Sequence, residues 1–123
     1  MLILNISNKK IIIYHNPKCK TSRDVLEILR MNNFEIEVID YIKNPLDHNK
    51  IKLLLKKLTI KPKKLIRKRE SIFKELKLDN HLNDDSYLIN KMVEFPKLIS
   101  RPVVIFENKA KICRPSKVIY ELI

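Results

Sequence analysis

At the start of this chain the hydrophobic residues follow first a pattern typical of a strand and then a spacing typical of a helix. Residues 11–14 form a β-branched and aromatic run that stops shortly before Pro17, as a buried strand entering a turn does. Behind that turn come apolar residues at helical spacing, namely Val25, Leu26 and Leu29. This spacing predicts a helix that begins near Cys19. Residues 34–41 then predict a second strand, and a helical crossover between two strands favours parallel pairing.

The stretch from about residue 45 to residue 96 keeps a helical period throughout. Its apolar residues recur every three or four positions, as in the groups Ile51, Leu54, Leu55, Leu58 and Leu88, Ile89, Met92, Val93. Asp47 and Asp84 are expected to cap helices here, and Pro96 to close the stretch. The pattern predicts an all-helical insertion.

Strand character returns after Arg101-Pro102. Residues 103–106 are too β-branched for a helix, and a hairpin through 107–110 leads to a fourth strand at 111–113. Pro115 opens a last helix. The element order is therefore β-α-β, helical insertion, β-β-α, which matches an α/β thioredoxin-like fold with a mixed four-stranded sheet. At 123 residues, we expect a single domain covering 1–123, with the insertion at about 45–96.

Charge and hydropathy restrict the partners. The chain has 26 Lys and Arg against 14 Asp and Glu, a formal net charge of +12 that would attract phosphates, nucleic acid or an anionic substrate. Because lysine is scattered over every segment and no aromatic platform accompanies it, we interpret the charge as compositional bias and expect no nucleic-acid partner.

Residues 1–10 lack the order of an export signal, and no apolar run approaches the ~20 residues of a membrane span. We expect a cytoplasmic protein without a membrane partner.

The two cysteines, Cys19 and Cys113, are expected to be free thiols, because the cytosol keeps thiols reduced. Cys19 lies in a polar turn before the apolar stripe of the predicted helix. A helix N-terminus lowers a cysteine pKa, so Cys19 is a candidate nucleophile, the alternative being a small buried hydrophobe. Cys113 could be a resolving partner for Cys19 or simply a core residue; the sequence leaves both open, and we favour the core.

The same helix start could bind a tetrahedral oxyanion, since its free backbone N–H groups point outward. Arginine is the natural partner for such an anion, and Arg101 and Arg114 each stand at a strand edge directly before a proline. His48 and His81 have no neighbouring ligand pattern of the kind that zinc requires, so we expect no metal.

At this point four segments together resemble one known family. Residues 15–23, His-Asn-Pro-Lys-Cys-Lys-Thr-Ser-Arg, resemble the signature of the glutaredoxin-dependent arsenate reductases. Residues 65–68, 100–104 and 113–116 resemble that family's three arginine segments in the same order. The resemblance covers about residues 11–122, and the length is that of a short-chain branch of the family, which is also related to the Spx-type regulators.

The resemblance implies roles for individual residues. Cys19 would attack arsenate or a similar oxyanion. The side chains that would bind it are Arg67, Arg101 and Arg114, with His15 and Ser22 in support and Pro102 as a cis proline. No cofactor would be bound, and glutathione and glutaredoxin would be external reductants. Lys20 departs from the pattern, since the family commonly has glycine there and this chain has none, so we expect the loop to be built with costlier residues.

A second reading belongs to a different class. Regulators of the same fold bind RNA polymerase without turning over a substrate, and some of them carry a Cys-x-x-Cys switch. Here Ser22 stands where the second cysteine would be. The enzyme, a glutaredoxin-dependent arsenate reductase, is therefore the prediction and the non-catalytic regulator its alternative.

Overall fold

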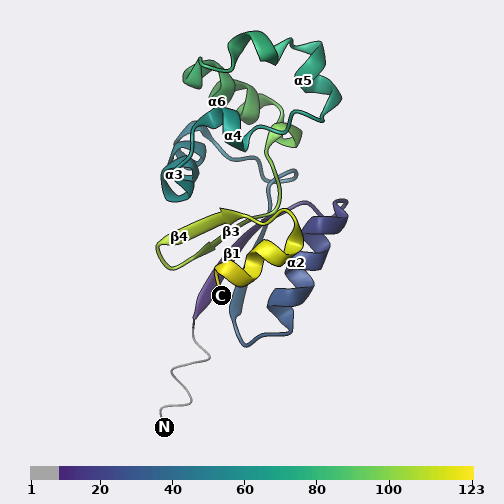
Figure 1. The fold of residues 1–123 in the computed structure, drawn as a ribbon, viewed down its shortest axis with the longest axis vertical. Coiled ribbons are helices and arrows are strands. Elements are labelled where there is room, and N and C mark those ends of the chain that lie inside the picture. Colours follow the sequence, from purple (N-terminus) through teal and green to yellow (C-terminus); the bar gives the residue numbers. More distant parts are fainter. Residues whose placement is uncertain (1–8) are drawn as a thin grey trace. The chain divides into compact units, whose positions relative to one another are not determined.

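The computed structural model describes residues 9–123, so the interpretation of residues 1–10 falls almost wholly outside the described part of the chain. Two compact units make up this part: residues up to Tyr41 join Arg101–Ile123 in the first, and Ile42–Ser100 form the second (Figure 1). The second unit corresponds to the predicted insertion. That the whole chain is one domain stays a prediction. Between residues 9 and 123, no helix has the length and apolar character needed to cross a bilayer.

The first unit is built on a mixed four-stranded sheet. Its strands are β1 (Lys10–His15), β2 (Glu35–Asp40), β3 (Val103–Phe106) and β4 (Lys109–Ile112), in the spatial order β2-β1-β3-β4. β1 and β2 are parallel and joined by helix α2 (Lys20–Arg30), while β3 runs antiparallel to both β1 and β4. The α/β class, the mixed sheet and the crossover helix predicted from sequence are confirmed.

One apolar core holds this unit together. α2 and the C-terminal 3-10 helix η3 (Ser116–Glu121) contact each other and share this core with the sheet (Figure 1). The buried residues of the core are Ile11, Ile13, Val25, Leu26, Leu29, Val104, Cys113, Ile119 and Leu122. Burial of such aliphatic side chains contributes about 1.5–3 kcal/mol each, which explains why the sequence periods located these elements well.

The strand register brings the last residues of β1 and β4 and the first residue of β3 to the same end of the sheet. Tyr14, near the end of β1, pairs with Val103, the first residue of β3, and Val103 pairs with Ile112, the last residue of β4. The segments just beyond these positions must therefore lie close together. They are the turn after His15, the Arg101-Pro102 pair and the segment that begins at Cys113.

The second unit is helical. It contains α3 (His48–Leu58), α4 (Pro62–Leu65), α5 (Ser71–Glu75), η1 (Leu78–His81), α6 (Asp85–Glu94) and η2 (Pro96–Leu98). The side chain of Asp47 accepts a hydrogen bond from the Lys50 N–H at 2.8 Å, and that of Asp84 accepts one from the Tyr87 N–H at 3.1 Å. Both predicted helix caps are confirmed.

Three residues of the described chain have a positive φ, although the sequence contains no glycine. They are Thr59 after α3, Lys77 after α5 and Glu107 in the turn between β3 and β4. Such positions normally favour glycine. All three lie at the end of a helix or in a hairpin turn, so the left-handed conformation serves to reverse the chain.

Candidate active site

Cys19 occupies the N-cap of α2. Its backbone is extended (φ −95°, ψ 122°), its N–H donates to the Asn16 carbonyl at 3.0 Å, and its own carbonyl accepts from the Arg23 N–H at 3.0 Å. The residue is half-buried and lies before the apolar stripe of the helix. The sulfur therefore stands at the helix N-terminus, as predicted, and not on the face that packs into the core.

Asn16 organises the turn that carries this cysteine. Besides accepting from Cys19, it accepts the Lys18 N–H on its side-chain oxygen at 3.0 Å and donates its own N–H to the Ser22 hydroxyl at 3.1 Å. Sequence reasoning assigned it no role. The available signal was an Asn-Pro pair directly before a helix, since asparagine side chains commonly close such turns onto the following backbone.

Ser22 and His15 form a buried pair beneath the turn. The Ser22 hydroxyl, fully shielded from solvent, lies 2.6 Å from Nδ1 of His15. Burial lowers the pKa of His15; the Arg30 and Arg23 charges act in the same direction, and Asp40 opposes them. The imidazole is accordingly neutral at pH 7. These two side chains hold the backbone of the turn, and their predicted effect on the thiolate stays a prediction.

Two of the three predicted arginines lie at this site. One Nη of Arg114 is 3.5 Å from the Cys19 sulfur and donates to the Arg101 carbonyl at 3.1 Å. Arg114 is exposed, whereas Arg101 is 8% exposed. The Arg101–Pro102 bond is cis, and so is the Arg114–Pro115 bond, which the sequence analysis did not single out.

These groups set the charge state of the thiol. Burial by itself would raise the pKa of Cys19, but the Ser22 backbone N–H, the Arg114 guanidinium and the charge of Arg101 together lower it below the usual value. Stabilisation of the thiolate, which is the nucleophilic form, by a helix N-terminus and a guanidinium is the arrangement that makes a cysteine reactive at neutral pH.

Arg67 lies in the second unit, just after α4. Its N–H donates to the Leu98 carbonyl at 2.6 Å, and its Nε pairs with the Glu70 carboxylate at 3.1 Å. The guanidinium is thus held in place by a local carboxylate. Its role in binding an oxyanion stays a prediction.

Cys113 has a different environment. It is 0% exposed, belongs to the core of the first unit just after β4, and is a free thiol like Cys19. Burial raises the pKa of Cys113 to about 12, with Lys111 lowering it slightly and Glu121 raising it. These observations favour the core residue over the resolving thiol.

Lys20 needs no glycine-like backbone. It is the first residue of α2, its side chain is exposed, and it forms an ion pair with Asp24 at 2.8 Å. In the described chain the positive φ angles fall elsewhere, so the turn that precedes α2 contains none. The expectation of a costlier loop is wrong, because ordinary L-residues satisfy every dihedral angle of this turn.

A thiol of lowered pKa at a helix N-cap, beside a strand that begins just after a cis proline in a β2-β1-β3-β4 sheet, defines a protein of thioredoxin-like fold. The chain belongs to the ArsC family, whose model matches residues 14–122.

Known proteins of similar sequence and structure agree with this placement. The uncharacterized protein YfgD of Escherichia coli K12 is 39% identical over 94% of this chain and 98% of its own length. The arsenate reductase of the same strain is 36% identical over 92% of this chain and 80% of its own. The solved arsenate reductase from Vibrio cholerae superposes with a TM-score of 0.89 at 32% identity, covering 94% of this chain and 99% of that one.

Proposed function

We propose that this protein is a cytosolic arsenate reductase that uses Cys19 as its nucleophile and takes its reducing equivalents from glutathione and glutaredoxin. The observation that carries the proposal is the 3.5 Å approach of the Arg114 guanidinium to the Cys19 sulfur at the start of α2. Family membership and relatives named as arsenate reductases support the choice of substrate. A phosphate-like oxyanion of similar geometry is the general substrate class.

The geometry supports nucleophilic attack. The Cys19 thiolate forms a sulfur–arsenic bond while the bond from arsenic to one hydroxyl oxygen breaks, and that hydroxyl takes up a proton from solvent and leaves as water. We expect backbone N–H groups of the first helical turn and the Arg114 guanidinium to donate hydrogen bonds to the negative oxygens of the adduct. Arg101 adds positive charge from the segment just before β3, and Arg67 is the proposed third cation.

Reduction needs two electrons from two thiols. A glutathione thiol attacks the adduct, arsenic(V) gains two electrons and leaves as arsenite, and Cys19 and glutathione are joined in a mixed disulfide. Glutaredoxin then reduces that disulfide and returns the Cys19 thiolate. Because Cys113 is fully buried, an external thiol takes the part that an internal cysteine would otherwise have. The reaction requires no bound cofactor and no metal.

A coupled assay tests the proposal. The purified protein is mixed with arsenate, glutathione, glutaredoxin, glutathione reductase and NADPH, and both NADPH loss and arsenite formation are followed. Wild-type protein and Cys113→Ala should turn over, whereas Cys19→Ser should not. Equal turnover by Cys19→Ser would reject Cys19 as the nucleophile. No turnover by wild-type protein that retains a low Cys19 pKa would reject arsenate as the substrate. Omission of glutaredoxin alone tests the reductant separately, because the first adduct should still form.

A further inference from the structure

Most of the net charge of the protein comes from one short segment. Residues 48–69 contain ten basic residues and no Asp or Glu, so +10 of the formal +12 belongs to α3, α4 and their flanks. The basic residues are Lys50, Lys52, Lys56, Lys57, Lys61, Lys63, Lys64, Arg67, Lys68 and Arg69. Lysine does occur in every segment, but the net charge does not, because the rest of the chain has 16 basic against 14 acidic side chains and is almost neutral.

This segment also borders an apolar hollow in the second unit. The hollow has a volume of about 440 Å³, within the range of ligand pockets. Leu55, Ile60, Pro62 and Ile89 supply its apolar surface. None of the residues that line it is aromatic, so nucleic-acid bases would find no stacking surface there.

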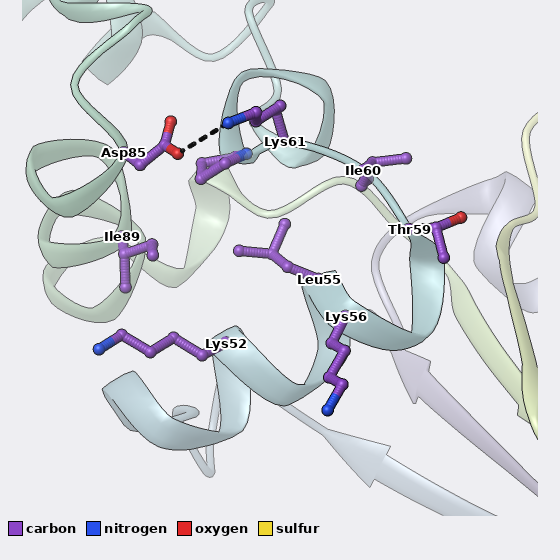
Figure 2. A pocket seen from close by; sticks show the side chains of 9 residues that line it. Lys52, Leu55, Lys56, Thr59, Ile60, Lys61, Asp85 and Ile89 are labelled. Atoms are coloured by element: carbon purple, nitrogen blue, oxygen red, sulfur yellow. Dashed lines mark ion pairs between the residues drawn. The ribbon is translucent and has the colours of Figure 1, made fainter.

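Cations surround this apolar surface. Lys52 and Lys56 are one turn apart on α3, and Lys61 pairs with Asp85 at 3.6 Å. Figure 2 shows Leu55 and Ile89 between Lys52 on one side and the Lys61–Asp85 pair on the other. Across residues 9–123 no carboxylate pairs with Lys52 or Lys56, and both side chains are exposed. Two available cations therefore flank an open apolar depression.

The Lys61–Asp85 pair indicates what the lysines around this hollow can bind. It holds a carboxylate at the edge of the hollow, yet the two side chains are 73% and 46% exposed, and such exposed pairs contribute only about 0–1 kcal/mol. An incoming carboxylate could engage Lys52 and Lys56 without disturbing it. The matching ligand carries an apolar side chain for the hollow and carboxylates spaced by one helical turn, about 6 Å.

We propose that this hollow, bounded by Lys52, Lys56, Lys61 and the apolar side chains of Leu55, Ile60 and Ile89, is a docking site for an acidic amphipathic helix of a partner protein. Charge complementarity selects the acidic partner and speeds its association. The aliphatic side chains that line the hollow favour a leucine-like side chain of the partner over a nucleotide base. The site uses no residue of the Cys19 machinery and is independent of the proposed reaction.

The first test uses a designed peptide as probe. A fluorescein-labelled peptide of about fifteen residues, long enough to form a marginal helix, carries leucines on one face and glutamates at i, i+4 beside them. Fluorescence anisotropy should show micromolar binding that weakens with added salt. Lys52→Glu/Lys56→Glu should lower the affinity at least about tenfold, equivalent to about 1.4 kcal/mol. The matched control Lys63→Glu/Lys64→Glu changes the net charge equally, does not line the hollow, and should have a clearly smaller effect.

Further probes separate the occupants. A peptide with the leucines replaced by serine keeps the charge and should bind at least about tenfold more weakly; equal binding would mean charge attraction only and would overturn the proposal. Ile60→Ser should weaken the leucine peptide without altering the salt dependence. Tighter binding of a 20-nucleotide single strand, or of phosphatidylglycerol vesicles, with the same dependence on Lys52 and Lys56 would also overturn it. Cys19→Ser should bind the peptide as the wild type does, and circular dichroism checks that every variant is folded.

Discussion

The Arg114 guanidinium lies 3.5 Å from the sulfur of Cys19, although 95 positions separate the two residues in the sequence. The contact follows from strand register. Because β3 is antiparallel to both β1 and β4, the end of β1 and the end of β4 meet at one edge of the sheet. The pairing of backbone groups in the sheet thereby determines which cation reaches the thiol.

Removal of that cation should make Cys19 less reactive. Arg114→Ala removes a donor and a positive charge from beside the thiolate, so the pKa of Cys19 should rise and its rate of alkylation at pH 7 should fall severalfold. Iodoacetamide labelling as a function of pH, read by mass spectrometry, measures both. Arg69→Ala is the control for a general loss of charge. Cys113 in the same samples should stay unlabelled until the protein unfolds, and an unchanged pKa in Arg114→Ala would contradict the assignment.

Arg67 should affect oxyanion binding without affecting the thiol. In the described chain its Nε pairs with Glu70, and it is not among the groups that shift the pKa of Cys19. Arsenate or phosphate should protect wild-type Cys19 from alkylation. In Arg67→Ala the concentration needed for protection should rise about tenfold, the effect of losing one charge-assisted contact of about 1.4 kcal/mol, while the pKa of Cys19 stays the same.

Arg67→Lys distinguishes charge from geometry in that experiment. Lysine keeps the charge but loses the planar fork, so it should restore protection only in part. Full protection in Arg67→Ala would remove Arg67 from the site and leave Arg101 and Arg114 as its cations.

Ser22→Ala should destabilise the protein. The Ser22 hydroxyl is fully buried and contacts both His15 and the Asn16 N–H, so its removal leaves buried polar groups without a partner. The expected loss in the free energy of unfolding is about 1–3 kcal/mol, measured by urea titration. Ser71→Ala, at an exposed position, is the matched control and should change the stability by less than about 0.5 kcal/mol.

Cys113 should make the fold sensitive to alkaline pH. Burial raises the pKa of Cys113 from its ordinary value of 9.0 to about 12 in the folded protein, so between these values the folded state holds a proton that the unfolded state has lost. Stability therefore falls as pH rises above about 9, by at most about 1.4 kcal/mol per pH unit. Urea titrations under reducing conditions at pH 7, 9 and 10 should show a steeper decline for wild type than for Cys113→Ala. Parallel declines would show that Cys113 does not titrate on unfolding.

Local patterns predicted the elements of this fold well. The apolar periods located all four strands and α2, and Asp47 and Asp84 cap helices where a short polar side chain before an apolar stripe indicated a cap. These features depend on residues a few positions apart, so the sequence displays them directly.

The site was harder to predict because it depends on distant contacts. Apart from the family resemblance, Arg101 and Arg114 stood out only as arginines before prolines. The register of the sheet explains why they lie near Cys19. Asn16 was overlooked because its importance lies in three hydrogen bonds of an irregular turn, one between backbone groups and two that each join a backbone N–H to a side-chain oxygen. Arg67 belongs to the helical unit, and no sequence motif predicted that its side chain pairs with Glu70.

The sealed position of Cys113 also bears on how the protein would respond to oxidants. If peroxide converts Cys19 to a sulfenic acid, no second sulfur of this chain can capture it as an internal disulfide, because the chain has only two cysteines and the other is inaccessible. Small thiols from solution would then have to cap the oxidised sulfur before further, irreversible oxidation occurs. During oxidative stress the lifetime of the protein's activity would depend on the surrounding pool of low-molecular-weight thiols.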